Sequence, residues 1–154
     1  IDLNSFLAVE FDFMYDILSA LQIILKQGVH LRIVLKVRAN GYRAQYKAFL
    51  KDYFPGMSVQ ILDQVPMINV MEKTDFYISA YSQSLFEASC LGIPCLYYKN
   101  DSQIFYPPYD GNSELVTVSN VSDRWEPPYF RDSTIKERGV GRDRNLLISC
   151  WYPQ

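Results

Sequence analysis

Short apolar runs alternate with longer helical patterns along most of this chain. The runs are rich in β-branched and aromatic residues and have the length of a strand. Leu31–Val37 is nearly continuously apolar, as expected of a strand that is covered on both faces. We predict strands at Phe6–Phe11, Leu31–Val37, Val59–Leu62, Phe76–Ser79, Cys95–Tyr98 and Leu115–Val118.

Between these runs, apolar positions recur at intervals of about 3.6 residues, which indicates amphipathic helices. In Asp12–Gln27 the apolar stripe includes Met14, Leu18 and Leu21, and Gly28 follows as a stop signal. The other predicted helices are Arg43–Phe54, Met67–Lys73, which Pro66 could begin, and Ser84–Gly92.

Strands that are separated by helices at this pitch favour parallel βαβ units. We therefore predict an α/β fold, a Rossmann-like doubly wound parallel sheet of about six strands with helices on both faces. Numbered along the chain, the expected strand order is 3-2-1-4-5-6. This nucleotide-binding type of domain is expected at residues 1–120. The pattern fails in residues 121–154, which we expect to form a wrapping tail and not a second domain.

Composition narrows the range of partners and locations. With 49% hydrophobic and 21% charged residues, the chain is typical of a globular domain that has a core. A net charge of -2 gives no electrostatic reason to expect nucleic acid as a partner. No apolar run approaches the roughly 20 residues that span a bilayer, so no transmembrane segment is predicted. Ile1 stands where an initiator Met is expected, which indicates a cut within a longer protein.

The cysteines and the motif inventory exclude several cofactors. Cys90, Cys95 and Cys150 form an odd set without metal-ligand spacing. Cys90 and Cys95 lie in apolar surroundings, so we expect buried, reduced thiols and a cytoplasmic location. The sequence has neither the G-x-G-x-x-G nor the P-loop pattern, so no bound NAD, ATP or metal cofactor is expected.

The segment Ser82–Pro94 (SQSLFEASCLGIP) follows the predicted strand Phe76–Ser79. In the expected strand order it lies at the switch point of the sheet, where ligands bind beyond the carboxyl ends of the strands. A helix N-terminus with serine hydroxyls beside it suits a phosphate, because its N–H groups are unpaired. Glu87, one turn into the helix, could accept hydrogen bonds from two neighbouring sugar hydroxyls.

A purely local explanation of the same segment stays open. Ser84-Leu85-Phe86-Glu87 fits the capping box S-x-x-E, in which Ser84 caps the helix and Glu87 bonds back to the cap. Gly92 would then be the C-terminal stop, with Pro94 beyond it. This explanation leaves Ser82 unaccounted for.

The run SQSLFEASCLGIPCLYY resembles the donor-binding motif of GT-B glycosyltransferases: a small or Ser residue, a helix, a Glu, then Gly-x-Pro before a strand. The preceding Lys73–Ser79 (KTDFYIS) resembles the strand that leads into that site. The resemblance covers roughly Leu31–Val118, most of a C-terminal GT-B domain, and extends to glycosyltransferases of bacterial cell-surface polysaccharides and capsules. It implies that the chain is one half of a GT-B fold.

The resemblance also implies roles for individual residues. Glu87 corresponds to the Glu that binds the nucleotide ribose, and Ser82, Gln83 and Ser84 correspond to the loop that contacts the diphosphate. The implied function is that of a donor domain, which binds a nucleotide diphospho-sugar as substrate for transfer to a glycan or lipid-linked acceptor. An N-terminal domain outside this sequence would hold the acceptor, and peripheral association with the inner face of the membrane is compatible with such work.

Two further places fit this hypothesis. Lys36 and Arg38 lie at the exit of the strand Leu31–Val37, where positive charge could neutralise a diphosphate leaving group. Snorkelling surface cations at a strand end are an equally good explanation of these two residues. Gln64 and Val65 follow the strand Val59–Leu62, where the family commonly receives the nucleobase on main-chain groups.

The sequence departs from the family after the strand Leu31–Val37 and again in the tail, so alternatives stay open. Many relatives carry a His-Pro pair where this chain has Arg38-Ala39-Asn40-Gly41, and its single histidine, His30, precedes the strand. We therefore name no general base. A sugar-nucleotide epimerase shares the architecture, but it usually has a glycine pair and two adjacent acids in this loop. The third hypothesis is a non-catalytic domain that keeps the fold for binding or assembly.

Overall fold

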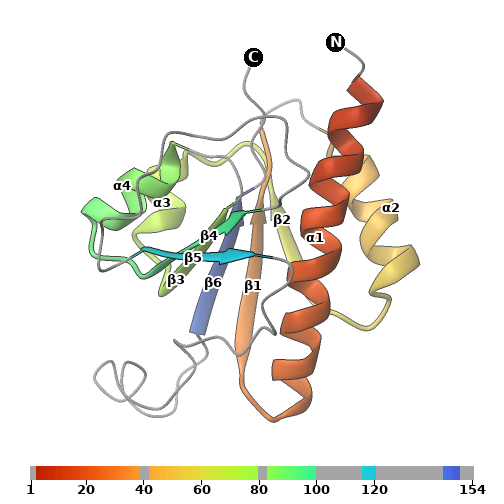
Figure 1. Ribbon diagram of the computed structural model, residues 1–154, viewed down its shortest axis with the longest axis horizontal. Helices are drawn as coiled ribbons and strands as arrows, with labels where there is room; N and C mark the ends of the chain where they lie inside the picture. Colours follow the sequence, from red (N-terminus) through yellow and green to blue (C-terminus); the bar gives the residue numbers. More distant parts are fainter. Residues whose placement is uncertain (1–2, 39–41, 80–82, 100–115, 121–143, 150–154) are drawn as a thin grey trace.

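The structure is a computed structural model that describes residues 3–38, 42–79, 83–99, 116–120 and 144–149, with only the backbone described at 3–10, 99 and 116–120. Figure 1 shows the helices and strands in these ranges. In chain order they are α1 (Leu3–Lys26), β1 (Leu31–Lys36), α2 (Arg43–Tyr53), β2 (Val59–Leu62), α3 (Met67–Met71), β3 (Phe76–Ser79), α4 (Ser84–Cys90), β4 (Cys95–Lys99), β5 (Val116–Asn120) and β6 (Arg144–Ser149). None of these helices is long and apolar enough to cross a membrane.

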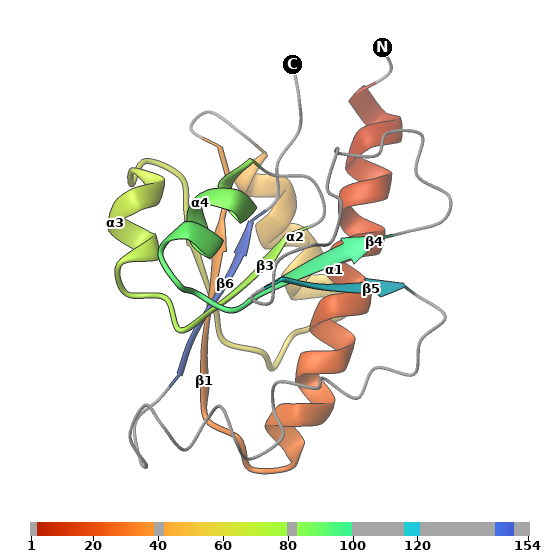
Figure 2. The same ribbon diagram turned by 60° about the vertical axis from the view of Figure 1, so that its left-hand side comes forward.

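The described strands form one sheet in the order β2-β1-β6-β3-β4-β5, and every neighbouring pair is parallel. Helices α1 and α2 cover one face of the sheet, and α3 and α4 cover the other face (Figures 1 and 2). The predicted α/β class and the doubly wound parallel sheet are therefore confirmed.

The centre of the sheet differs from the prediction in one strand. Phe6–Phe11, predicted to be the central strand, belongs to helix α1, so that prediction was wrong. The central place between β1 and β3 belongs to Arg144–Ser149, which we had expected within the wrapping tail. The five other strands take the places in the sheet that were predicted for them. Across the sheet these strands are 59–62, 31–36, 76–79, 95–99 and 116–120, with β6 between the second and the third.

Alternate residues of β1 and of β6 enter two different cores, as the pleat requires. On the α1 and α2 side, Ile33 and Leu35 of β1 join Ile148 of β6 in the larger cluster. On the α3 and α4 side, Val34 of β1 and Leu147 of β6 join the smaller cluster. Burial on both faces explains why Ile33–Leu35 of β1 and Leu146–Ile148 of β6 are continuously apolar instead of alternating.

Aromatic rings join α2 to α1. Phe11 of α1 stacks on Phe49 of α2, with ring centroids 4.9 Å apart and the ring planes within 7° of parallel. Tyr15 of α1 meets Tyr53 edge to face at 5.9 Å and also packs on Phe54, which follows α2. Such pairs add about 0.5–1.5 kcal/mol each beyond the burial of their area. They fix the helix that follows β1 on the α1 side of the sheet.

Helix α4 ends in a Schellman motif. Gly92 has a positive φ of 71°, its N–H donates to the Ser89 carbonyl at 3.0 Å, and the Ile93 N–H donates to the Ala88 carbonyl at 3.0 Å. Ile93 and Ala88 are buried in the same core cluster, which is the apolar contact that accompanies this motif. The predicted stop signal at Gly92 is confirmed, and it turns the chain directly into β4.

Replacing Gly92 by Ala is expected to lower the free energy of unfolding by about 1 kcal/mol, because an L side chain is strained in the left-handed region. No atom lies within 4 Å of an added Cβ, so the loss reports backbone conformation and not a clash. Chemical denaturation measures it. Gly56→Ala is the matched control, since Gly56 has the same open space without a positive φ. Equal effects of the two substitutions would contradict the assignment.

The two described cysteines differ in their surroundings. Cys95 is fully buried at the start of β4, and burial raises the pKa of its thiol to about 12. It is a free thiol, as predicted. Cys90 is also free but exposed, so the expectation of a buried thiol there was wrong. Helix α4 buries its Leu85 and Ala88 side instead, and Cys90 lies off that stripe. Cys150 lies outside the described residues.

Candidate functional site

The switch point of the sheet lies at the carboxyl ends of β1, β6 and β3. The chain leaves β1 through α2 on one face and reaches β2 on one side of the sheet. It leaves β3 through α4 on the opposite face and reaches β4 on the other side. Connections that diverge in this way leave a crevice beyond the strand ends, and open α/β sheets bind their ligands there. Here β6 lies between the two diverging strands.

Three polar side chains meet at these strand ends. Ser149 of β6 is in register with Lys36 of β1 on one side and with Ser79 of β3 on the other. All three have the parity of the strand residues that face α3 and α4, so they lie on that face of the sheet. All three are buried, which is unusual for a lysine. The Ser79 hydroxyl also donates to the Ser149 carbonyl, at 3.4 Å.

Lys36 is held by main-chain carbonyls. Its Nζ donates to the carbonyl oxygen of Val37 at 2.7 Å and to that of Asp63 at 3.1 Å. The residue is only 8% exposed, so the alternative of a snorkelling surface cation is wrong for Lys36. Burial lowers its pKa below the usual value, and the nearby Asp63 carboxylate acts in the opposite direction. The ammonium thus bridges the exits of β1 and β2.

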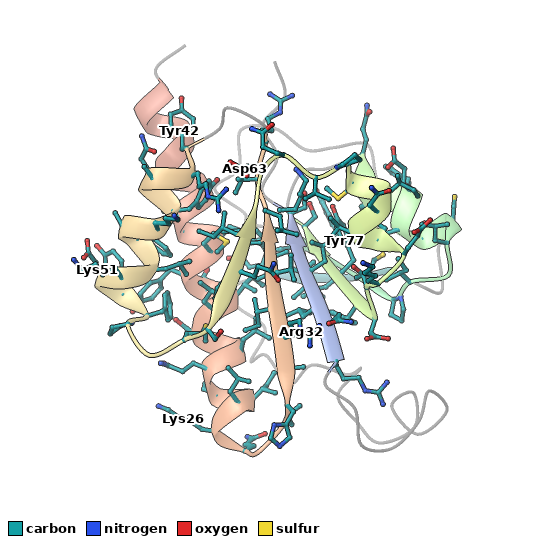
Figure 3. The ribbon with its side chains drawn as sticks, turned by 180° about the vertical axis from the view of Figure 1, so that it is seen from behind. Lys26, Arg32, Tyr42, Lys51, Asp63 and Tyr77 are labelled. Carbon is teal, nitrogen blue, oxygen red and sulfur yellow. The ribbon has the colours of Figure 1, made fainter. Side chains whose placement is uncertain are left out.

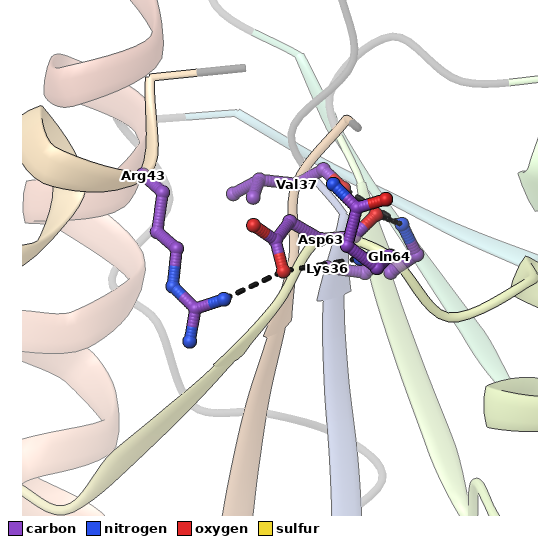
Figure 4. Close-up of polar contacts among 5 residues, drawn as sticks. All are labelled: Lys36, Val37, Arg43, Asp63 and Gln64. Carbon is purple, nitrogen blue, oxygen red and sulfur yellow. Dashed lines mark hydrogen bonds and ion pairs between the residues drawn. The ribbon is translucent and has the colours of Figure 1, made fainter. Parts of the chain in front are cut away.

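Asp63, directly after β2, carries a carboxylate that is fixed from two sides (Figure 4). Its Oδ1 accepts a hydrogen bond from Arg43 Nη1 at 2.6 Å and another from the Gln64 N–H at 3.0 Å. The Arg43 hydrogen bond is the main reason why the pKa of Asp63 lies below its usual value. The Asp63 side chain is therefore an anion throughout the physiological pH range and can only accept hydrogen bonds.

The predicted diphosphate and ribose residues on α4 lie beyond the end of β3. Ser84 is the first residue of α4 and is partly buried, whereas Gln83 and Glu87 are exposed. Gln83, not Ser84, occupies the cap position, and the Gln83 side chain forms no capping hydrogen bond. The start of α4 thus differs by one residue from the capping box, which places the cap at Ser84. Ser82 lies outside the described residues.

The remaining predicted residues follow β1 and β2. Arg38 is exposed, two residues beyond the end of β1. Gln64 and Val65 are exposed in the loop after β2, next to Asp63. Figure 3 shows Asp63 at the end of the sheet to which the strand arrows point, opposite Lys26 and Arg32. The structure thus brings Lys36 and the Gln64 loop together through Asp63, at the carboxyl edge.

Four members of this edge were missed by sequence reasoning. Arg43 and Asp63 are 20 positions apart, and nothing in a single sequence pairs a residue at a helix start with one at a strand exit. Ser79 and Ser149 end apolar runs, which was a detectable signal, but their pairing depends on the place of β6. A polar residue that ends a buried parallel strand is the pattern that would have found them.

The described part of the chain holds no candidate metal site. No three His, Cys, Asp or Glu side chains gather there in a way that could hold a metal ion. Comparison of the sequence with protein-family models and with curated proteins, and of the structure with solved structures, finds no match.

Proposed function

We propose that this chain is the donor-binding domain of a GT-B glycosyltransferase. In this proposal the carboxyl edge of the sheet binds a nucleotide diphospho-sugar, and the sugar passes to a glycan or lipid-linked acceptor held by a further domain. The chain would be one half of the GT-B architecture, and its catalytic partner groups would belong to the other half.

The observation that carries the proposal is the switch point at β1, β6 and β3. Many functions share a doubly wound sheet, so the fold alone does not select one. The family-like segment Ser82–Pro94, however, directly follows the strand that borders this crevice. The Gly-x-Pro part of the segment is the Schellman turn into β4, which explains its spacing without explaining Glu87.

The charges at this edge suit a diphosphate leaving group. Arg38 is exposed after the end of β1. Lys36 is buried at the end of β1, which pairs directly with β6. Cations that are already in place stabilise negative charge as it develops on the leaving oxygen, since they need no reorganisation. Helix α4 has only seven residues, so its dipole adds less than a long helix would. The support therefore comes mainly from the strand ends.

Calorimetric titration with UDP-, GDP-, CDP- and ADP-sugars tests the proposal. At least one of them is expected to bind the folded chain. Glu87→Ala is expected to weaken that binding about tenfold, the usual loss for a hydrogen-bonded ligand hydroxyl. The free energy of unfolding of Glu87→Ala is expected to stay within about 0.5 kcal/mol of the wild-type value, because Glu87 is exposed.

Glu72→Ala is the matched control for Glu87→Ala. Glu72 is also exposed, but it follows α3 as the chain returns to the amino edge of the sheet, so its loss should leave affinity unchanged. Absence of binding by all four sugar nucleotides to a folded sample would refute the proposal. Binding without transfer, when an acceptor domain is supplied, would instead favour the non-catalytic alternative.

A further inference from the structure

Asp63 lies where the predicted base-binding loop begins, and its acceptor capacity is only partly used. The two hydrogen bonds that Arg43 and Gln64 donate to its carboxylate both go to Oδ1. A carboxylate offers about four lone-pair positions. The Asp63 N–H also faces this carboxylate, but within the described residues no other residue donates to Oδ2, and the side chain is 19% exposed. The anion therefore keeps room for a ligand that carries hydrogen-bond donors.

The same contacts fix the direction of this acceptor. Arg43 Nη1 and the Gln64 N–H hold one oxygen at 2.6 and 3.0 Å, so the carboxylate plane cannot turn freely. Lys36 Nζ donates to the main-chain carbonyl of Asp63 at 3.1 Å, which fixes the main chain at Asp63. Groups that are ordered before binding lose little entropy when a ligand arrives. An ordinary exposed ion pair has no such hydrogen bonds to its main chain, so the carboxylate of Asp63 is unusually well ordered.

The position of Asp63 relative to the crevice selects the part of the ligand it meets. Its strand β2 is next to β1, and β1 is next to β6, with neighbouring strands about 4.8 Å apart. A nucleotide whose diphosphate occupies the switch point can extend over the end of β1 toward β2. Its base would then reach the loop at Asp63 and Gln64.

We infer that Asp63 reads the nucleobase and selects guanine, so that the donor is a GDP-sugar. This inference rests on the proposed function. Guanine presents two adjacent donors, N1–H and the N2 amino group, which one carboxylate can receive together. Uracil presents a single N–H between two carbonyl oxygens, and a fixed anion repels both of them. Adenine and cytosine each place a ring-nitrogen acceptor beside their amino group, so neither offers two adjacent donors.

Titration of the chain with GDP, UDP, ADP and CDP tests the inference. GDP is expected to bind about 10- to 100-fold more tightly than UDP, the range for hydrogen bonds to a charged group. Asp63→Asn is expected to weaken GDP binding about tenfold and to change UDP binding less than about twofold. The amide keeps the size of the side chain but turns a donor toward the donors of guanine.

Two further variants make the result decisive. Asp52→Asn makes the same change at an exposed position late in α2, toward the amino edge, and should leave all affinities unchanged. If Asp63→Asn does not fold, Arg43→Gln keeps the carboxylate and removes its clamp. That variant should bind GDP more weakly than the wild type and still prefer GDP to UDP.

The outcomes separate this inference from the proposed function. Equal binding of GDP and UDP, or an equal loss of both in Asp63→Asn, would overturn the guanine assignment and leave a nucleotide-binding domain. Preference for UDP would also overturn it. If none of the four nucleotides binds, the proposed function fails, and the guanine assignment fails with it.

Discussion

Ile148→Ala is expected to lower the free energy of unfolding by about 3–4 kcal/mol, the cost of a large cavity in a core that cannot collapse. Ile148 lies in the central strand β6 and is 0% exposed. It is in register with Leu35 of β1 and Ile78 of β3, and all three belong to the core under α1 and α2. Urea denaturation measures the loss.

Ile23→Ala is the matched control for this prediction. It removes the same atoms from α1, where Ile23 is 60% exposed, so we expect a change within about 0.5 kcal/mol. A wrapping tail would tolerate Ile148→Ala almost as well as α1 tolerates Ile23→Ala. A loss below about 1 kcal/mol at Ile148 would therefore contradict the central place of β6.

The sequence predicted the fold correctly where the local pattern of a segment agrees with its position in the tertiary structure. Apolar runs such as Ile33–Leu35 and the stop signal at Gly92 act through neighbouring residues, so they can be recognised without the fold. Strand order also followed from the alternation of strands and helices, because crossover connections are right-handed and short. These rules placed five strands of the sheet correctly.

The central strand could not be predicted in the same way. Phe6–Phe11 is apolar and short enough for a strand, yet the stripe of Phe11, Met14 and Leu18 continues backward into it at helical spacing. Periodicity does not separate the two readings of so short a run. The run Leu146–Ile148 gave an equally weak signal, and its long-range pairing with β1 and β3 decides its structure.

The candidate site was predictable in outline and not in detail. The edge of the sheet and the loop after β2 followed from strand order. The burial of Lys36 did not, because it depends on two carbonyls, one of them 27 positions away. The contact of Asp63 with Arg43 likewise exists only once the start of α2 lies beside the end of β2. Pairs of this kind are properties of the folded chain.

Tyr98→Phe is the second substitution with a large expected effect, a loss of about 1.5–2.5 kcal/mol of stability at pH 7. Tyr98 of β4 is 2% exposed, and its hydroxyl donates to Asp16 Oδ2 of α1. The ring also packs on Phe13, with centroids 5.2 Å apart, and Phe keeps that contact. The loss thus measures the hydrogen bond to a partly buried carboxylate. Tyr53→Phe, at a residue 60% exposed, is the control.

The same residue predicts how stability depends on pH at the alkaline end. Burial, and then the Asp16 hydrogen bond and the charges of Asp16 and Asp12, raise the pKa of Tyr98 above its ordinary 10.0. The folded chain therefore keeps a proton that the unfolded chain loses, so this contribution is complete below pH 10 and falls as the pH rises above it. Tyr98→Phe should remove that part of the decline. Parallel declines of the two proteins between about pH 10 and 11 would show that Tyr98 titrates normally, and that its link to α1 is weaker than its burial implies.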